Sequence, residues 1–304
     1  MVDNKNFKDM VVSGLQNLCG NSGEVSLHDV YKNNNIVYSG VIVRVDGENM
    51  SQIIYLESYY EKFCKGTDIE TIVREIFEIW KSRNPDNVKF DLAKFKDYDN
   101  YKDKIVIKLI NHDTNERLLQ DVPHKAYLDM AVVFYVLMNN YQNENMTFLV
   151  YNKHLELWNI NADELYETAM ENSLKLLPCK INTLSEVVSE ILGREDDEIL
   201  PKLDKEVYVA TNSLKSNGAA VITYPNALKD LSKSLNKNLV ILPSSIHECI
   251  IVPSDNNMEF EALRAMVVEV NRNEVSREDF LSDNIYFYDK EKEQLSIIKM
   301  GNNV

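Results

Sequence analysis

A short polar stretch between two apolar runs carries the side chains best suited to chemistry. In the string LPSSIHECIIVP, Ser244 and Ser245 precede His247 and Glu248. A histidine that takes the proton of a serine hydroxyl creates a nucleophile, and a carboxylate such as Glu248 or Asp255 can orient the imidazole. The stretch therefore predicts, as one alternative, a hydrolase or transferase that uses His247 with Ser244 or Ser245.

The same stretch also has a simpler structural interpretation. Adjacent residues of a strand point to opposite faces, so Glu248 is badly placed to orient His247. Pro243 ends one apolar run and Pro253 ends the next, as expected for two strands joined by a turn. Because a lone histidine without placed partners seldom catalyses, we favour this structural interpretation.

Two other sets of residues are candidates for binding. His124 lies in the string DVPHKAYLDMA shortly before Asp129, and it could be brought to His247 from the other part of the chain. Tyr59 and Tyr60 belong to an aromatic-rich segment that could line a groove for a peptide. The favoured alternatives are structural: a histidine at the entry to a buried strand, and a core with tyrosine hydroxyls at its rim.

The sequence lacks the patterns of common cofactor and metal sites. It has nine glycines, none of them arranged as G-x-G, and no phosphate loop or dinucleotide-binding motif. No two histidines lie at metal-ligand spacing. Four cysteines are scattered without a C-x-x-C pair, which is typical of reduced thiols. We therefore predict no cofactor and no metal.

Charge and hydropathy limit the classes of partner. The 304-residue chain has a net charge of −15, with 33 acidic and 21 basic residues before residue 200 against 15 and 12 after it. Such an acidic chain repels phosphate backbones, so nucleic acid is not expected as a partner. No apolar run reaches the ~20 residues that span a bilayer, and the first residues do not follow the pattern of a secretory signal.

Hydrophobic periodicity predicts the elements of the first half of the chain. A helix is expected over 5–19, followed by two strands around Asn33-Asn34-Asn35 and a third strand, QIIYL. Thr67 and Glu70 form a predicted capping box that opens the next helix. The further predictions are strands over 104–111, 127–138 and 147–152, a helix capped by Asn161, and a helix capped by Thr183 with Glu186.

The segment 193–206 is the predicted boundary, because it joins a glycine, a run of four acidic residues and a proline. Beyond it the pattern is β-β-α-β-β-α-β-β, which includes AAVITYP as a strand. Short connections between neighbouring strands favour antiparallel sheets and an α+β fold. The predicted domains are an acidic α+β part, 1–199, and a smaller β-rich part, 200–304.

Several strings run from about residue 30 to about residue 288: YKNNNIVYSGVIV, IIYLESYYEKFCKG, DVPHKAYLDMAVVFYV, LWNINADELYETAMENS, ILPSSIHECIIVP and LSDNIYFYD. They resemble an uncharacterised family, domain of unknown function 5688, of gut-dwelling Gram-positive anaerobes, itself distantly similar to the YtpQ group. The sequence departs from the family at Gln52, where a proline is expected. The resemblance implies that the serine–histidine hairpin and the segment around His124 are family features. It supplies no activity or ligand.

These observations favour a cytoplasmic, non-catalytic protein that binds a protein or a small ligand. The alternative is the hydrolase or transferase based on His247, and a third hypothesis is that the acidic first part mimics nucleic acid and occupies a basic partner. The oligomeric state is not predicted.

Overall fold

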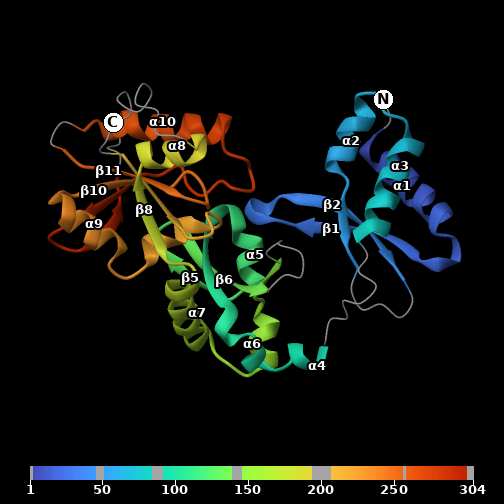
Figure 1. Cartoon of the computed structure of the whole chain (residues 1–304), viewed down its shortest axis with the longest axis horizontal. Helices are drawn as coiled ribbons and strands as arrows, with labels where there is room; N and C mark the ends of the chain where they lie inside the picture. Colours follow the sequence, from blue (N-terminus) through green and yellow to red (C-terminus); the bar gives the residue numbers. More distant parts are fainter. Residues whose placement is uncertain are drawn as a thin grey trace. The chain divides into compact units, whose positions relative to one another are not determined.

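The structure is a computed structural model that describes residues 3–45, 51–83, 92–138, 146–193, 207–255 and 258–299. The chain divides into two compact units, Met1–Lys94 and Phe95–Val304 (Figure 1). The buried side chains of the N-terminal unit form one cluster, and those of the C-terminal unit form several others. Each unit therefore has a hydrophobic core of its own.

The N-terminal unit combines helices with a small antiparallel sheet in the order β1-β2-β3. Its elements are α1 (Asn4–Cys19), β1 (Glu24–Tyr31), the 3-10 turn η2 (Asn33–Asn35), β2 (Val37–Arg44), β3 (Ile53–Tyr55), α2 (Glu57–Cys64) and α3 (Ile69–Arg83). The predicted first helix, the two strands around the asparagine turn and the third strand are confirmed. Gln52, where a proline was expected, directly precedes β3.

The core of this unit is built from the apolar stripes of α1 and α3 and from the sheet. Burial recurs at helical spacing on both helices, at Phe7, Val11 and Leu15 on α1 and at Ile72, Val73 and Ile76 on α3. Leu18 was expected on the same inner face, but its side chain is 45% exposed.

The cap of α3 differs from the prediction by one residue. Asp68, not Thr67, provides it: the Asp68 carboxylate accepts the Thr71 N–H at 2.8 Å and the Thr71 hydroxyl at 2.7 Å. An aspartate accepts these bonds at least as well as a threonine, and the helix accordingly begins at Ile69.

The first sheet of the C-terminal unit is organised around β6 (Met130–Met138), which pairs antiparallel with β4 (Ile105–Asn111), β5 (His124–Tyr127) and β7 (Met146–Leu149). The three predicted strands are confirmed. β6 begins later than expected because Leu128, with φ of 59°, and Asp129 form the turn between β5 and β6. Leu119 of α5 (Glu116–Asp121) and Trp158 of α6 (Asn152–Trp158) belong to the cores of this unit, and α7 (Ala162–Leu176) packs on β4. The short helix α4 (Leu92–Phe95) spans the division between the two units in the sequence.

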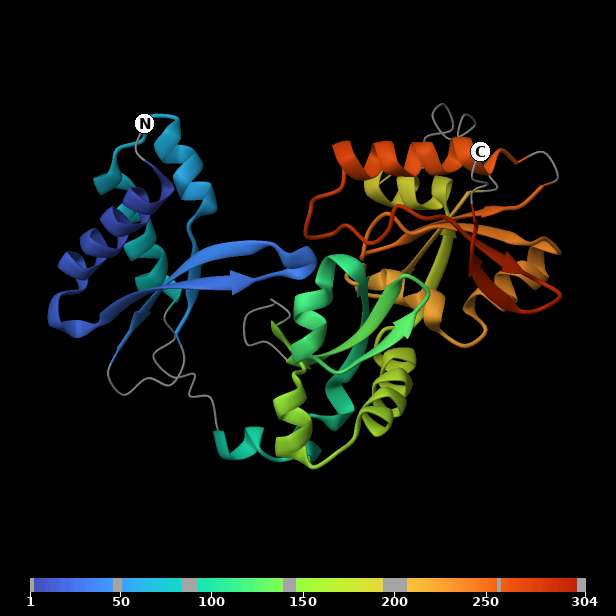
Figure 2. The same ribbon diagram turned by 180° about the vertical axis from the view of Figure 1, so that it is seen from behind.

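The second sheet has six antiparallel strands in the order β13-β12-β10-β11-β9-β8, which confirms the α+β class. Its elements are β8 (Cys179–Thr183), α8 (Leu184–Leu192), β9 (Tyr208–Asn212), α9 (Ala227–Leu235), β10 (Leu239–Leu242), β11 (Cys249–Pro253), α10 (Phe260–Asn273), β12 (Tyr286–Asp289) and β13 (Gln294–Ile297) (Figure 2). The predicted helix caps at Asn161 and at Thr183 with Glu186 are also confirmed.

One predicted strand is wrong. The string AAVITYP lies in the 3-10 helix η7 (Gly218–Thr223), of which Gly218 to Ile222 are buried. A Cβ on Gly218 would lie 2.1 Å from Thr211 Oγ1 and 2.5 Å from the His247 carbonyl oxygen, so only glycine permits this close crossing over β9. In a short, fully apolar run, the spacing of hydrophobic residues cannot distinguish a buried strand from a buried helical turn.

Of the predicted boundary at 193–206, only Gly193 belongs to the described residues, and 194–206 lie outside them. β8, which precedes this segment, pairs with β9, which follows it, from Cys179↔Asn212 to Thr183↔Tyr208. In the sequence, the division between the two compact units instead falls after Lys94. The predicted division into 1–199 and 200–304 therefore does not coincide with them.

Candidate binding groove

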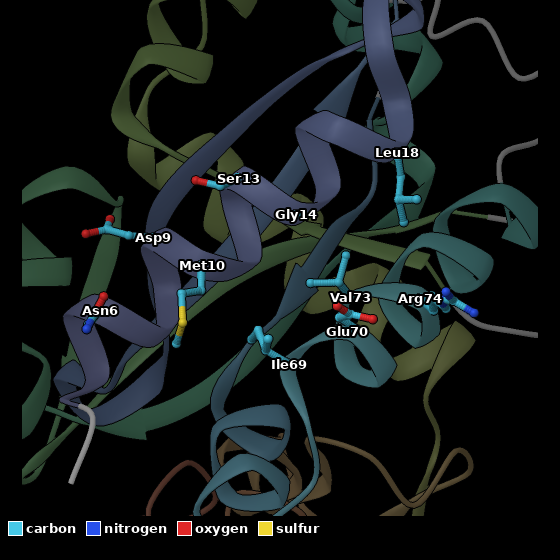
Figure 3. Close-up of a pocket in the computed structure, with 10 residues that line it drawn as sticks. All are labelled: Asn6, Asp9, Met10, Ser13, Gly14, Leu18, Ile69, Glu70, Val73 and Arg74. Atoms are coloured by element: carbon cyan, nitrogen blue, oxygen red, sulfur yellow. The ribbon is translucent and has the colours of Figure 1, made fainter.

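A groove of about 550 Å³ lies between α1 and α3 of the N-terminal unit (Figure 3). Apolar side chains and one glycine form its floor, and polar side chains lie along its edges. The floor consists of Met10, Gly14, Leu18, Ile69 and Val73, and the edges carry Asn6, Asp9, Ser13, Glu70 and Arg74.

Gly14 sets how closely the two helices approach. A Cβ at this position would lie 2.8 Å from Cγ2 of Val73, closer than two carbon atoms pack. Glycine inside a helix costs about 1 kcal/mol relative to alanine, so its place here follows from the close crossing and not from helix propensity. The crossing brings the apolar side chains of both helices to one floor.

Both helices contribute apolar side chains to the exposed surface of the groove. Met10 and Leu18 extend from α1 toward the space above Ile69 and Val73 on α3 (Figure 3). Leu18 is 45% exposed. Apolar side chains that gather at a concave surface with a polar rim are typical of binding sites.

Three charged side chains lie at the edges of the groove: Asp9 on α1, and Glu70 and Arg74 on α3. No ion pair joins any of them to another residue in the part of the chain that the structure describes. The ten lining residues include no histidine and no cysteine. The groove is therefore suited to apolar contact with charge pairing at its rim.

A second, smaller cavity of about 220 Å³ adjoins the start of α1 and α2. The predicted Tyr60 is among its lining residues, whereas Tyr59 is buried in the core at 8% exposure. Glu57, another lining residue, accepts the Ser39 N–H through Oε1 at 2.6 Å. Of the two tyrosines, Tyr60 lines this cavity and Tyr59 does not.

His247 lies before β11 in the C-terminal unit, and both ring nitrogens have partners. Nδ1 accepts the Asn217 N–H at 3.2 Å, so a neutral ring carries its proton on Nε2. Nε2 lies 3.1 Å from Asp279 Oδ1, and the other oxygen of Asp279 accepts the Ser276 hydroxyl at 2.8 Å. The ring is therefore held between a backbone amide and a carboxylate.

The two candidate serines contact other groups. Ser245 is buried, and its hydroxyl oxygen accepts the backbone N–H of His247 at 3.0 Å. The carbonyl of Ser244 accepts the Leu281 N–H at 3.2 Å, and Glu248 is half-buried at the start of β11. No hydrogen bond joins a serine hydroxyl to the His247 ring among the described residues, so the geometry gives the enzyme hypothesis no support.

His124 and Asp129 lie at opposite ends of β5 and do not form a site together. His124 is exposed, and its Nδ1 lies 3.1 Å from the Val122 carbonyl oxygen. Within the described residues, the ring of His124 contacts neither Asp129 nor His247. The structure therefore does not bring the two candidate histidines together.

Asp129 instead anchors a polar network with the segment before β12. Its Oδ2 accepts the Ser282 hydroxyl at 2.8 Å and the Asn284 amide at 2.9 Å, and its Oδ1 accepts the Tyr286 hydroxyl. Burial, followed by the charge of Asp129, raises the pKa of Tyr286. Three side-chain donors from the segment before and within β12 converge on Asp129, so the network joins the two sheets of this unit as a structural connection.

Sequence reasoning missed the groove and the partners of His247 and Asp129. Two signals for the groove were present: Gly14 in the middle of a helix and Leu18 at its end. The string SREDFLSDN contains Ser276, Asp279, Ser282 and Asn284, residue types that bond to nearby backbone in turns. None of these sequence features reveals which distant helix or strand the residues contact.

The described residues lack two further features. No group of three or more histidine, cysteine, aspartate or glutamate side chains there could hold a metal ion. Among the described helices, none has the length and apolar character needed to cross a membrane.

The model of a family of unknown function, DUF5688, matches residues 4–290. This match confirms the predicted resemblance; it does not address the likeness to the YtpQ group or the origin of the protein. No curated protein and no solved structure matches the chain.

Proposed function

The chain belongs to the DUF5688 family, and we propose that it is a non-catalytic protein that binds an amphipathic helix of a partner protein in the α1–α3 groove. The observation that carries this proposal is the groove itself, whose apolar floor and polar edges come from two helices. Helix-in-groove recognition uses apolar residues spaced i, i+3 or i+4, and i+7 on the bound helix.

The length of the groove supports a helical occupant. Its lining residues on α1 run from Asn6 to Leu18, which corresponds to about 18 Å of helix at about 1.5 Å per residue. A helix of roughly three turns matches this length and presents two or three apolar side chains to the floor. Small molecules also occupy pockets of this volume, so the test must separate the two kinds of ligand.

The charges at the rim constrain the partner helix further. Asp9 on one edge favours a basic residue on the partner, and on the other edge Glu70 favours a basic residue and Arg74 an acidic one. Exposed ion pairs contribute only about 0–1 kcal/mol each, so they would set the orientation of the bound helix. The apolar floor would supply most of the affinity.

We test this proposal by selecting displayed helical peptides on the full chain. Binders are then compared on Leu18→Asp and on the control Leu214→Asp, because Leu18 and Leu214 are each 45% exposed and lie in different units. A charge in place of Leu18 removes apolar contact, so affinity falls about tenfold or more. The control leaves affinity unchanged.

Two results would contradict the proposal. Selected peptides that lack helical apolar spacing would exclude helix recognition, and binders equally sensitive to both substitutions would place the binding surface elsewhere. A small apolar probe could also bind saturably to the natural chain, lose its binding in Leu18→Asp and not be displaced by any selected peptide. This result would indicate a small-molecule site in the same groove.

We also propose a cytoplasmic location. All four cysteines are free, and Cys64 is exposed; an exposed thiol persists most readily in a reducing compartment. Fractionation of cells that produce the protein, with alkylation of Cys64 before lysis, tests this. If Cys64 were alkylated only after treatment with a reducing agent, this would contradict a cytoplasmic location.

A further inference from the structure

The N-terminal unit has a long strand at the edge of its sheet. β1 pairs with β2 over eight consecutive positions, from Glu24↔Arg44 to Tyr31↔Val37, and it is the outermost strand in the order β1-β2-β3. The end of the β1–β2 hairpin extends beyond the helices of this unit in both views (Figures 1 and 2). The side of β1 opposite β2 therefore presents a strand edge.

The contacts of β2 show which backbone groups of β1 face outward. The Ser39 N–H goes to Glu57 and the Ser39 carbonyl accepts the Leu56 N–H at 2.9 Å, so Ser39 directs both groups away from β1. Its partner Asp29 must do the same in the other direction, because opposite residues of an antiparallel pair share one hydrogen-bonding state. Every second residue of β1 then faces outward.

A separate contact at the start of β1 agrees with this assignment. The outward N–H of Val25 is bonded to Gln16 Oε1 at 3.0 Å. Further along the edge, no hydrogen bond is recorded for the N–H or carbonyl of Leu27 and Asp29 within the described residues. These two residues present four backbone groups at the spacing that an added strand requires.

β1 also lacks the features that normally prevent strand addition. Natural edges are blunted by proline, lysine, bulges or short length. The β1 sequence EVSLHDVY has no proline and no lysine, and its register with β2 is unbroken. Apolar side chains remain exposed along the hairpin, at 38% for Leu27, 47% for Tyr31 and 45% for Val37.

We propose that β1 binds an extended segment of a partner protein as an additional strand, with a basic residue opposite Asp29 and apolar residues on either side of it. Charge complementarity selects this occupant, because β1 carries Glu24 and Asp29 and no lysine or arginine. Leu27, Asp29 and Tyr31 lie on one face of the strand, so the partner would place apolar, basic and apolar side chains at alternate positions. This surface is separate from the α1–α3 groove.

The test uses the full chain and a fluorescent heptapeptide in which threonine alternates with valine, lysine and valine. Binding is followed by anisotropy, and amide exchange over residues 24–31 is followed by mass spectrometry. The peptide should slow exchange in this segment, with no change over α1 and α3. Leu18→Asp should leave the affinity unchanged, which separates this site from the groove.

Leu27→Pro provides the sharpest variant. The Leu27 N–H faces away from β2, so proline there removes an outward donor without removing a bond of the β1–β2 ladder. We expect the affinity for the peptide to fall about tenfold. The matched control Leu27→Thr keeps the N–H and should retain more of the affinity. Circular dichroism of both variants checks that the unit stays folded.

Asp29→Lys tests the choice of partner independently. It should weaken binding of the lysine peptide about two- to fivefold and strengthen binding of the same peptide with glutamate in place of lysine. Absence of slowed exchange over 24–31, or equal binding to Leu27→Pro, overturns the proposal. A dimer in sedimentation that is lost in Leu27→Pro also overturns it, in favour of a second copy on the same edge.

Discussion

At the scale of single residues, Asp129 accepts hydrogen bonds from the side chains of Ser282, Asn284 and Tyr286. Asp129→Ala leaves these partly or fully buried donors without an acceptor, and each such loss costs about 1–3 kcal/mol. We therefore expect the free energy of unfolding to fall by about 3 kcal/mol or more in urea titrations. The control is Asp113→Ala, because the Asp113 side chain is 86% exposed and bonds to His112 alone among the described residues. Equal stability of the two variants would show that the network contributes nothing.

His154 makes the C-terminal unit sensitive to acid. Its ring lies among Phe95, Phe148, Tyr151 and Trp158, and burial lowers the pKa of His154. Its Nδ1 also accepts the Tyr151 N–H at 3.1 Å, a bond that the protonated ring cannot make.

The sign of the pH effect follows from this shift. With a folded pKa below the unfolded value of about 6.5, the unfolded chain binds the proton more readily. The stability provided by neutral His154 is therefore complete above pH ~6.5 and is lost as the pH falls through the folded pKa. Urea titrations between pH 7.5 and pH 5 should show a steeper loss for the natural chain than for His154→Gln. Parallel curves would contradict this account.

At the scale of single residues, the sequence indicated the types of side chain at the candidate sites but not their partners. His247 was recognised, whereas its partners Asn217 and Asp279 come from distant parts of the chain. The type of a residue indicates its possible chemistry, whereas its hydrogen-bond partners are determined by the fold.

At the scale of elements, η7 shows why a predicted strand failed. Its close crossing over β9 depends on Gly218, where a Cβ would meet Thr211 Oγ1, the His247 carbonyl and the Asn212 nitrogen within 2.7 Å. Gly218→Ala should lower the free energy of unfolding by about 3 kcal/mol.

Gly20→Ala is the matched control for this substitution. Gly20 ends α1 with φ of 57°, and nothing lies within 4 Å of an added Cβ, so only backbone strain of about 1–3 kcal/mol applies. Urea titrations of the two variants separate crowding from strain. A smaller effect of Gly218→Ala than of Gly20→Ala would contradict the described crossing.

Elements with clear periodicity or caps were predictable, as α1, β4 and the capping box of Thr183 with Glu186 show. The groove was not, because it arises where Gly14 of α1 meets Val73 of α3. Hydrophobic periodicity identifies the buried face of each helix, but the crossing of two helices depends on contacts between distant residues.

At the scale of the whole molecule, the division of the cores determines which fragments fold. The buried cluster of the N-terminal unit contains only residues before Lys94, and a cluster of the C-terminal unit joins Val136 to Ala210. We expect fragment 95–304 to unfold cooperatively in urea titrations followed by circular dichroism, a readout that also serves shorter fragments without Trp158. Fragment 200–304 should not, because it lacks β8 and the whole first sheet. Cooperative unfolding of 200–304 alone would support the boundary predicted from the sequence.

The measurement that tests the central proposal most directly is site-specific photo-crosslinking in cells that naturally contain the protein, with benzoylphenylalanine in place of Leu18 and, as control, Leu214. The groove account predicts that position 18 alone crosslinks to one defined protein segment, whose apolar residues recur at helical spacing. Crosslinks of the same identity from both positions, or none from position 18 beyond those of the control, would contradict it.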